Sequence, residues 1–193
     1  MLARTAARPR TMSTELRRAV FFDRDGTLME EVHYCADPKL VRVFDGVPEA
    51  LRSLKGAGFA VIIITNQSGI GRGLFSEAQY RAVAEEFLRQ AGSEVIEATY
   101  FCPDAPGVPS RCRKPEPGMV LAAAAAYGID LAGSYFVGDK VADIECGRRA
   151  GTRTILVLTG YGAGEETAAD IVCRDAVEAT DVILREARST PAA

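Results

Sequence analysis

Short apolar runs alternate with amphipathic segments along most of the chain. Runs of β-branched, aromatic and other apolar residues predict buried strands at 19–22, 59–65, 97–101, 134–137 and 154–158. Apolar positions at helical spacing predict helices at 45–57, 76–90, 117–128 and 142–150, then a closing pair around Ile171 and 177–185. Strands that alternate with helices indicate an α/β fold in three layers, with a parallel sheet between helices on both faces.

Several local signals sharpen this picture. Ser76 and Gln79 have the spacing of a capping box, which starts a helix. The glycines of 69–73 lack the spacing of a dinucleotide-binding loop, so we interpret them as a flexible turn. The Pro-rich stretch 102–117 is too short for a domain and is well placed for a loop over a site.

Length and composition indicate one globular domain. The 193 residues are 48% hydrophobic, enough for one substantial core, and we expect a disordered tail at 1–17 followed by a single domain at 18–188. The net charge of −3 offers no basic field for nucleic acid, and no apolar stretch is long enough for a membrane span. Five widely spread cysteines favour reduced thiols in a cytoplasmic protein, which we expect to be a monomer.

Polar residues follow three of the predicted strands, where an α/β sheet binds its ligands. These segments are Asp23-Arg24-Asp25-Gly26-Thr27, Thr65-Asn66-Gln67-Ser68 and Gly138-Asp139-Lys140. Asp23 and Asp25 are two apart and face the same side while the chain is extended. Neighbouring carboxylates repel unless a cation lies between them, and a cluster of oxygen ligands with Asp139 suits magnesium.

Lys114 and Thr65 complete a set suited to phosphoryl transfer. An ammonium group and a hydroxyl can hold phosphoryl oxygens while an in-line nucleophile attacks. The only histidine, His33, has no Ser or Cys arranged with it as a catalytic triad.

In order and spacing, these residues resemble the four motifs of the haloacid dehalogenase superfamily of phosphohydrolases. The matching segments are Asp23-x-Asp25-Gly26-Thr27, Thr65, Lys114, and Gly138-Asp139-x-x-x-Asp143. The resemblance implies a Rossmann-like fold with Asp23 as nucleophile, Asp25 as general acid and then base, and Thr65 and Lys114 as phosphoryl stabilisers. It also implies Mg²⁺ held by Asp23, Asp25 through its backbone carbonyl, and Asp139, with Asp143 in support.

Within that superfamily, the segments are similar to the branch of heptose 1,7-bisphosphate and histidinol-phosphate phosphatases. This likeness implies a small phosphorylated metabolite as substrate, most specifically the 7-phosphate of D-glycero-D-manno-heptose 1,7-bisphosphate. The residues it implies as substrate contacts are Glu31, Val32, His33, Tyr34, Asn66, Gln67, Ser68, Arg113 and Lys140. The short connection from Thr27 to Asp45 leaves no room for a large cap domain.

One departure concerns zinc. The branch usually carries a zinc site before the lysine motif, whereas the corresponding positions here include only Cys102 and Cys112 as thiols, with Asp104 and Ser110 beside them. Two thiols and a carboxylate are an incomplete structural zinc site, so we expect a zinc-free loop.

Other functions remain open at this stage. Histidinol phosphate or another sugar phosphate is the first alternative to the heptose substrate. A nucleic-acid 3′-phosphatase shares several motifs but would need a basic, aromatic-rich stripe. A non-catalytic binding protein is disfavoured because every residue that the mechanism needs is present.

Overall fold

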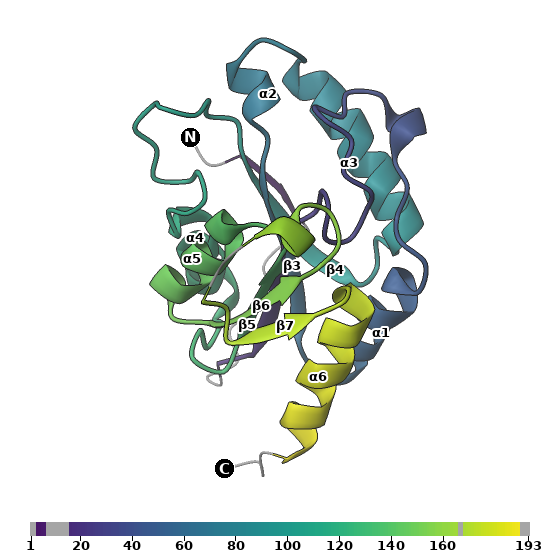
Figure 1. The fold of residues 1–193 in the computed structure, drawn as a ribbon, viewed down its shortest axis with the longest axis vertical. Helices are drawn as coiled ribbons and strands as arrows, with labels where there is room; N and C mark the ends of the chain where they lie inside the picture. Colours follow the sequence, from purple (N-terminus) through teal and green to yellow (C-terminus); the bar gives the residue numbers. More distant parts are fainter. Residues whose placement is uncertain (1–2, 7–15, 166–167, 190–193) are drawn as a thin grey trace.

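The computed structural model of the chain describes residues 3–6, 16–165 and 168–189 (Figure 1). Within these residues, seven strands form one sheet in the order β1-β4-β3-β2-β5-β6-β7. The strands are β1 (Ala3–Ala6), β2 (Ala19–Phe22), β3 (Ala60–Asn66), β4 (Ile96–Cys102), β5 (Tyr135–Gly138), β6 (Arg153–Val157) and β7 (Ile171–Cys173). Strands β2 to β7 pair in parallel, which confirms the predicted α/β sheet.

The amino-terminal segment corrects one prediction. We expected disorder throughout 1–17, yet Ala3–Ala6 pairs antiparallel with β4 and adds an edge strand to the otherwise parallel sheet. Arg17 also forms an ion pair with Glu97, with Nη1 and Oε1 2.9 Å apart. The rest of the expected tail, at 1–2 and 7–15, lies outside the described residues. Ordered contacts of the domain therefore begin before residue 18.

Helices cover both faces of the sheet, as the alternating pattern predicted. One face carries α1 (Val47–Gly56), α3 (Glu77–Ala91) and α6 (Ala176–Ser189), and the other carries α4 (Gly118–Tyr127) and α5 (Val141–Ala150) (Figure 1). The predicted capping box is present, because the Ser76 hydroxyl accepts from the Gln79 N–H and the Gln79 side chain accepts from the Ser76 N–H. The stretch interpreted as a flexible turn instead contains a short helix, α2 (Ser68–Gly71).

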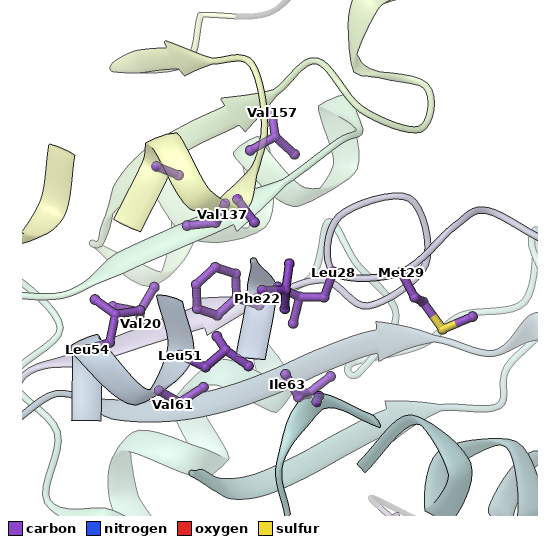
Figure 2. Close-up of a cluster of buried hydrophobic side chains, with 14 of the residues drawn as sticks. Val20, Phe22, Leu28, Met29, Leu51, Leu54, Val61, Ile63, Val137 and Val157 are labelled. Atoms are coloured by element: carbon purple, nitrogen blue, oxygen red, sulfur yellow. The ribbon is translucent and has the colours of Figure 1, made fainter. Parts of the chain in front are cut away.

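The larger core lies between the sheet and α1, α3 and α6. Figure 2 shows Val20, Phe22 and Ile63 of the central strands close to Leu51 and Leu54 of α1. All five side chains are buried, as expected for parallel strands that are covered on both faces. Burial of apolar surface stabilises a fold by on the order of 25 cal/mol per Å². The packed core therefore fixes the central strands and the residues at their ends.

No large cap domain is inserted between β2 and α1. Between Thr27 and α1, the chain contains only a single 3-10 turn, η1 (Pro38–Leu40). A second 3-10 turn, η2 (Gly162–Gly164), follows β6. In the part of the chain that the structure describes, no helix combines the length and the apolar character that a membrane span needs.

Candidate active site

Three adjacent strands bring the predicted catalytic residues to one edge of the sheet. Asp23 directly follows β2, Thr65 is near the end of β3, and Asp139 follows β5. The Asp23 N–H donates to the Val137 carbonyl at 2.9 Å, which ties the first motif to the neighbouring strand. The parallel register of β3, β2 and β5 therefore assembles the site from segments far apart in the sequence.

Lys114 lies at the centre of this edge. Its Nζ is 2.6 Å from Oδ1 of Asp23 and 2.6 Å from Oδ1 of Asp143, and all three side chains are buried. Burial alone would lower the pKa of Lys114, but the charges of the two carboxylates outweigh it and raise that pKa. The ammonium group therefore stays charged beside the predicted nucleophile.

Asp23, Asp139 and Asp143 form a buried carboxylate cluster. One oxygen of each lies within 4.8 Å of the others. Burial and the charge of Asp23 raise the pKa of Asp139 to about 7. Burial raises the pKa of Asp143 to about 6, although the Lys114 charge opposes the shift.

This cluster fits Mg²⁺. The donors are hard oxygen atoms, and three buried carboxylates gather beside the single buried ammonium group of Lys114. Asp139 is further fixed by the Thr27 hydroxyl, which donates to Oδ1 at 3.3 Å, and by the Tyr161 N–H, which donates to Oδ2 at 3.0 Å. These contacts orient the carboxylate, as outer partners do in metal sites.

Asp25 is held by a second set of donors. The Arg24 guanidinium donates to its carboxylate from Nε at 3.1 Å and from Nη2 at 2.8 Å, and Gln67 Nε2 donates at 2.9 Å. Burial would raise the pKa of Asp25, but the Arg24 charge outweighs it and holds that pKa below its usual range. Sequence reasoning gave Arg24 no role, although an arginine between two motif aspartates was the available signal.

A cavity of about 300 Å³ opens onto these groups. It is lined by Asp23, Asp25, Thr65 and Lys114 and by all nine predicted substrate contacts, Glu31, Val32, His33, Tyr34, Asn66, Gln67, Ser68, Arg113 and Lys140. The structure thus brings the predicted residues together, while their roles stay predictions. Sequence reasoning missed five further lining residues, Cys35, Gly69, Phe75, Ala142 and Tyr161.

Not every predicted substrate contact faces the cavity freely. Gln67 is only 6% exposed, and its amide nitrogen also donates to the Thr65 hydroxyl at 2.9 Å. Asn66 hydrogen-bonds the backbone of Lys114 in both directions. These two amides therefore also position catalytic groups.

The loop before Lys114 corrects one cysteine prediction. Cys102 and Cys112 are joined as a disulfide, with Cα atoms 5.6 Å apart, where we expected reduced thiols. Asp104 Oδ2 lies 3.6 Å from the Cys102 sulfur and 3.4 Å from the Cys112 sulfur, so these three residues could hold a metal only with both cysteines reduced. Among the described residues, Cys35, Cys146 and Cys173 are free and buried.

Known phosphatases are similar to this chain over most of its length. A family model described as HAD-hydrolase-like matches residues 111–183. The D-glycero-beta-D-manno-heptose-1,7-bisphosphate 7-phosphatase of Yersinia pestis is 41% identical over 80% of this chain and 88% of its own length. The D-glycero-alpha-D-manno-heptose-1,7-bisphosphate 7-phosphatase of Burkholderia mallei is 38% identical over 82% of this chain and 89% of its own length.

Solved structures show the same relationship. The D,D-heptose 1,7-bisphosphate phosphatase from B. bronchiseptica, complexed with magnesium and phosphate, aligns with a TM-score of 0.81 and 32% identity. The alignment covers 88% of this chain and 99% of that one. Sequence similarity over most of both chains accompanies the shared fold. The chain therefore belongs to the haloacid dehalogenase superfamily of phosphatases.

Proposed function

We propose that the protein is a D-glycero-D-manno-heptose-1,7-bisphosphate 7-phosphatase that forms an aspartyl-phosphate intermediate on Asp23. The main structural support for this mechanism is the buried Lys114 ammonium, which lies 2.6 Å from Asp23 Oδ1 and lines the same cavity. The substrate is supported by relatives that are 38–41% identical over most of their length.

The chain's own residues account for both half-reactions. Asp23 attacks the phosphorus and the bond to the sugar oxygen breaks, while Asp25 delivers a proton to that leaving oxygen. Asp25 must be protonated at this step, although the Arg24 charge favours its carboxylate form in the substrate-free site. Asp25, then a carboxylate, takes a proton from the water that attacks the aspartyl phosphate, and inorganic phosphate leaves. Lys114 stabilises charge on the phosphoryl oxygens throughout, with the hydroxyl of Thr65 as a second donor.

Mg²⁺ is the metal that we assign to this reaction. Asp23, Asp139 and the backbone carbonyl of Asp25 would hold it, with Asp143 in support. When bound, the ion neutralises charge on the phosphate group and so lowers the cost of bringing it to a carboxylate nucleophile. The buried cluster of Asp23, Asp139 and Asp143 supports this assignment.

A cationic cavity wall favours a substrate with a second phosphate. The Arg113 guanidinium donates to the Asp104 carbonyl at 3.3 Å and, in the described part of the chain, pairs with no carboxylate. Burial and the nearby charge of Arg72 lower the pKa of Arg113, although the Asp104 charge opposes the shift, so a second positive charge lies near this wall. A sugar bisphosphate would place its non-reacting phosphate there.

Histidinol phosphate is the second candidate, because it offers the same reacting phosphate but a cationic amine. The unpaired charge of Arg113 disfavours it. A nucleic-acid 3′-phosphatase is disfavoured by the net charge of −3. A non-catalytic role is disfavoured by the complete set of catalytic groups around Asp23.

The test is a phosphate-release screen with Mg²⁺ over both anomers of the heptose bisphosphate, heptose 7-phosphate, histidinol phosphate and 3′-phosphorylated DNA. We expect the highest kcat/KM with a heptose bisphosphate. A higher value with histidinol phosphate would overturn the substrate assignment. Equal kcat/KM values for heptose bisphosphate and heptose 7-phosphate would show that the second phosphate does not contribute to substrate recognition.

A further inference from the structure

Tyr161 is a cavity residue for which the reaction chemistry gives no role. It follows β6 in the loop that leads to η2, and its side chain is 48% exposed. Scattered exposed apolar residues need no special explanation. Tyr161 differs because it lines the cavity that holds Asp23 and Lys114.

The backbone at Tyr161 is fixed against the metal cluster. Its N–H donates to Asp139 Oδ2 at 3.0 Å. Gly160 adopts φ +55°, and a Cβ there would overlap Asp139 Oδ2 and approach the Gly26 Cα to 2.7 Å. A Cβ at Gly162 would overlap the carbonyl oxygen of Val157. Two glycines that have no room for a side chain therefore flank one large aromatic residue.

The ring contacts a charged cavity residue. The Lys140 Nζ lies 4.6 Å from the centre of the Tyr161 ring and 3.0 Å from Glu31 Oε2. Lys140 is thus held between a carboxylate and an aromatic ring on one wall of the cavity.

We infer that the Tyr161 ring is a specificity-determining wall that packs against the carbohydrate part of the substrate. The inference rests on the proposed function, in which a sugar phosphate enters this cavity. Ligand cavities commonly combine aromatic surface with a few polar groups that fix orientation. A ring presents apolar area to the C–H bonds of a sugar, while Lys140 and Glu31 supply partners for hydroxyl groups.

The test compares Tyr161→Ala and Tyr161→Phe in the full-length, Mg²⁺-loaded enzyme. With heptose bisphosphate, we expect Tyr161→Ala to raise KM about three- to tenfold with kcat nearly unchanged, the scale of one aromatic contact. Tyr161→Phe keeps the ring and is expected to behave as wild type. Leu158→Ala changes an exposed apolar residue of the same segment outside the cavity lining and is the matched control.

Inorganic phosphate separates this role from an indirect effect through Asp139. Its inhibition constant is expected to stay unchanged in Tyr161→Ala, because phosphate binds without a sugar. An unchanged KM in Tyr161→Ala, a KM for Tyr161→Phe equal to that of Tyr161→Ala, or a parallel rise in the phosphate inhibition constant would each overturn the inference.

The same variants are measured with the sugar phosphate that wild type hydrolyses fastest. If this is not a heptose bisphosphate, the proposed substrate is wrong. A raised KM in Tyr161→Ala, with kcat and the phosphate inhibition constant unchanged, would still support contact between the Tyr161 ring and the sugar. If heptose bisphosphate is the best substrate and KM does not move, the proposed function stands and the Tyr161 inference fails.

Discussion

Asn66 and the backbone of Lys114 hydrogen-bond each other reciprocally. Asn66 Oδ1 accepts from the Lys114 N–H at 3.0 Å, and Asn66 Nδ2 donates to the Lys114 carbonyl at 3.2 Å. This pair joins the end of β3 to the loop that carries the lysine, 48 residues later in the chain. It therefore sets where the Lys114 ammonium meets Asp23.

We expect Asn66→Ala to lower kcat roughly 10- to 100-fold with a smaller change in KM, because a displacement of about 1 Å at a catalytic group is costly. Asn66→Asp keeps the acceptor for the Lys114 N–H and loses the donor, so its kcat is expected to be intermediate. Steady-state kinetics with the best substrate would check both variants. A raised KM with an unchanged kcat in Asn66→Ala would instead identify Asn66 as a substrate contact only.

The covalent mechanism predicts that Asp23→Asn lowers kcat by roughly 10⁴-fold, because an amide is a poor nucleophile. The fold is expected to survive, since Lys114 keeps Asp143 at 2.6 Å as a partner for its charge. Circular dichroism would check the fold. Beryllium fluoride with Mg²⁺ is expected to protect wild type against thermal unfolding but not Asp23→Asn. Substantial turnover by that variant would rule out the covalent step.

The strands, the helices and the edge of the sheet that holds the catalytic residues could be predicted from sequence, because their signals are local. A buried run such as Phe59 to Thr65 and the Ser76 capping box each specify an element within a few residues. Once the strands are parallel, the residues after Phe22, Ile64 and Gly138 must share an edge. The approach of Asp23 to Asp139 follows from that rule, whereas Asp143 lies on α5 and was expected only from the family resemblance.

Features that depend on contacts between distant loops could not be predicted. The pairing of Ala3–Ala6 with β4 joins segments almost a hundred residues apart and has no local pattern beyond a weak strand tendency. Tyr161 was missed because its place depends on the close approach of Gly160 to Gly26. Asn66 and Gln67 were expected to contact the substrate because the family resemblance implies it, whereas their hydrogen bonds to Lys114 and Asp25 depend on segments distant in the sequence.

Protons and Mg²⁺ compete for the Asp139 carboxylate, so the stabilisation of the protein by Mg²⁺ is expected to depend on pH. Burial and Asp23 raise the pKa of Asp139 to about 7, above its ordinary value of about 3.9. In the metal-free protein, the folded state therefore holds this proton more tightly than the unfolded state does, and stability falls as pH rises between those values. Mg²⁺ binds the ionised carboxylates, so it is expected to stabilise the protein more at about pH 8 than at about pH 5.5.

Thermal melts with and without Mg²⁺ at both pH values would measure this difference. At a concentration of 100 times Kd, the stabilisation by Mg²⁺ is expected to be about 2.7 kcal/mol. Asp139→Asn is expected to lose most of the Mg²⁺ effect at both pH values. An equal Mg²⁺ shift of Tm at both pH values in wild type would show that the ion does not bind at Asp139.

The five cysteines predict a specific pattern of thiol reactivity. Burial raises the pKa of Cys146 to about 12 and that of Cys173 to about 11, and it also raises the pKa of Cys35. Native protein is therefore expected to react slowly with a thiol reagent. Denatured protein without reductant is expected to show three thiols, because Cys102 and Cys112 are joined, and reduced protein is expected to show five.

A disulfide at this position and a bound zinc ion exclude each other, so the loop before Lys114 can be tested directly. Asp104 and two thiols fall one ligand short of the four that a structural zinc site normally has. We expect elemental analysis of protein purified without added metal to find little zinc.

The double variant Cys102→Ser, Cys112→Ser is expected to lose about 2–3 kcal/mol of stability under oxidising conditions, since the disulfide closes a short loop. With reductant present, its Tm is expected to approach that of wild type, because reduction removes the same constraint from both proteins. Near-stoichiometric zinc in wild type, lost in the double variant together with a fall in Tm that persists in reductant, would show instead that these residues hold a metal.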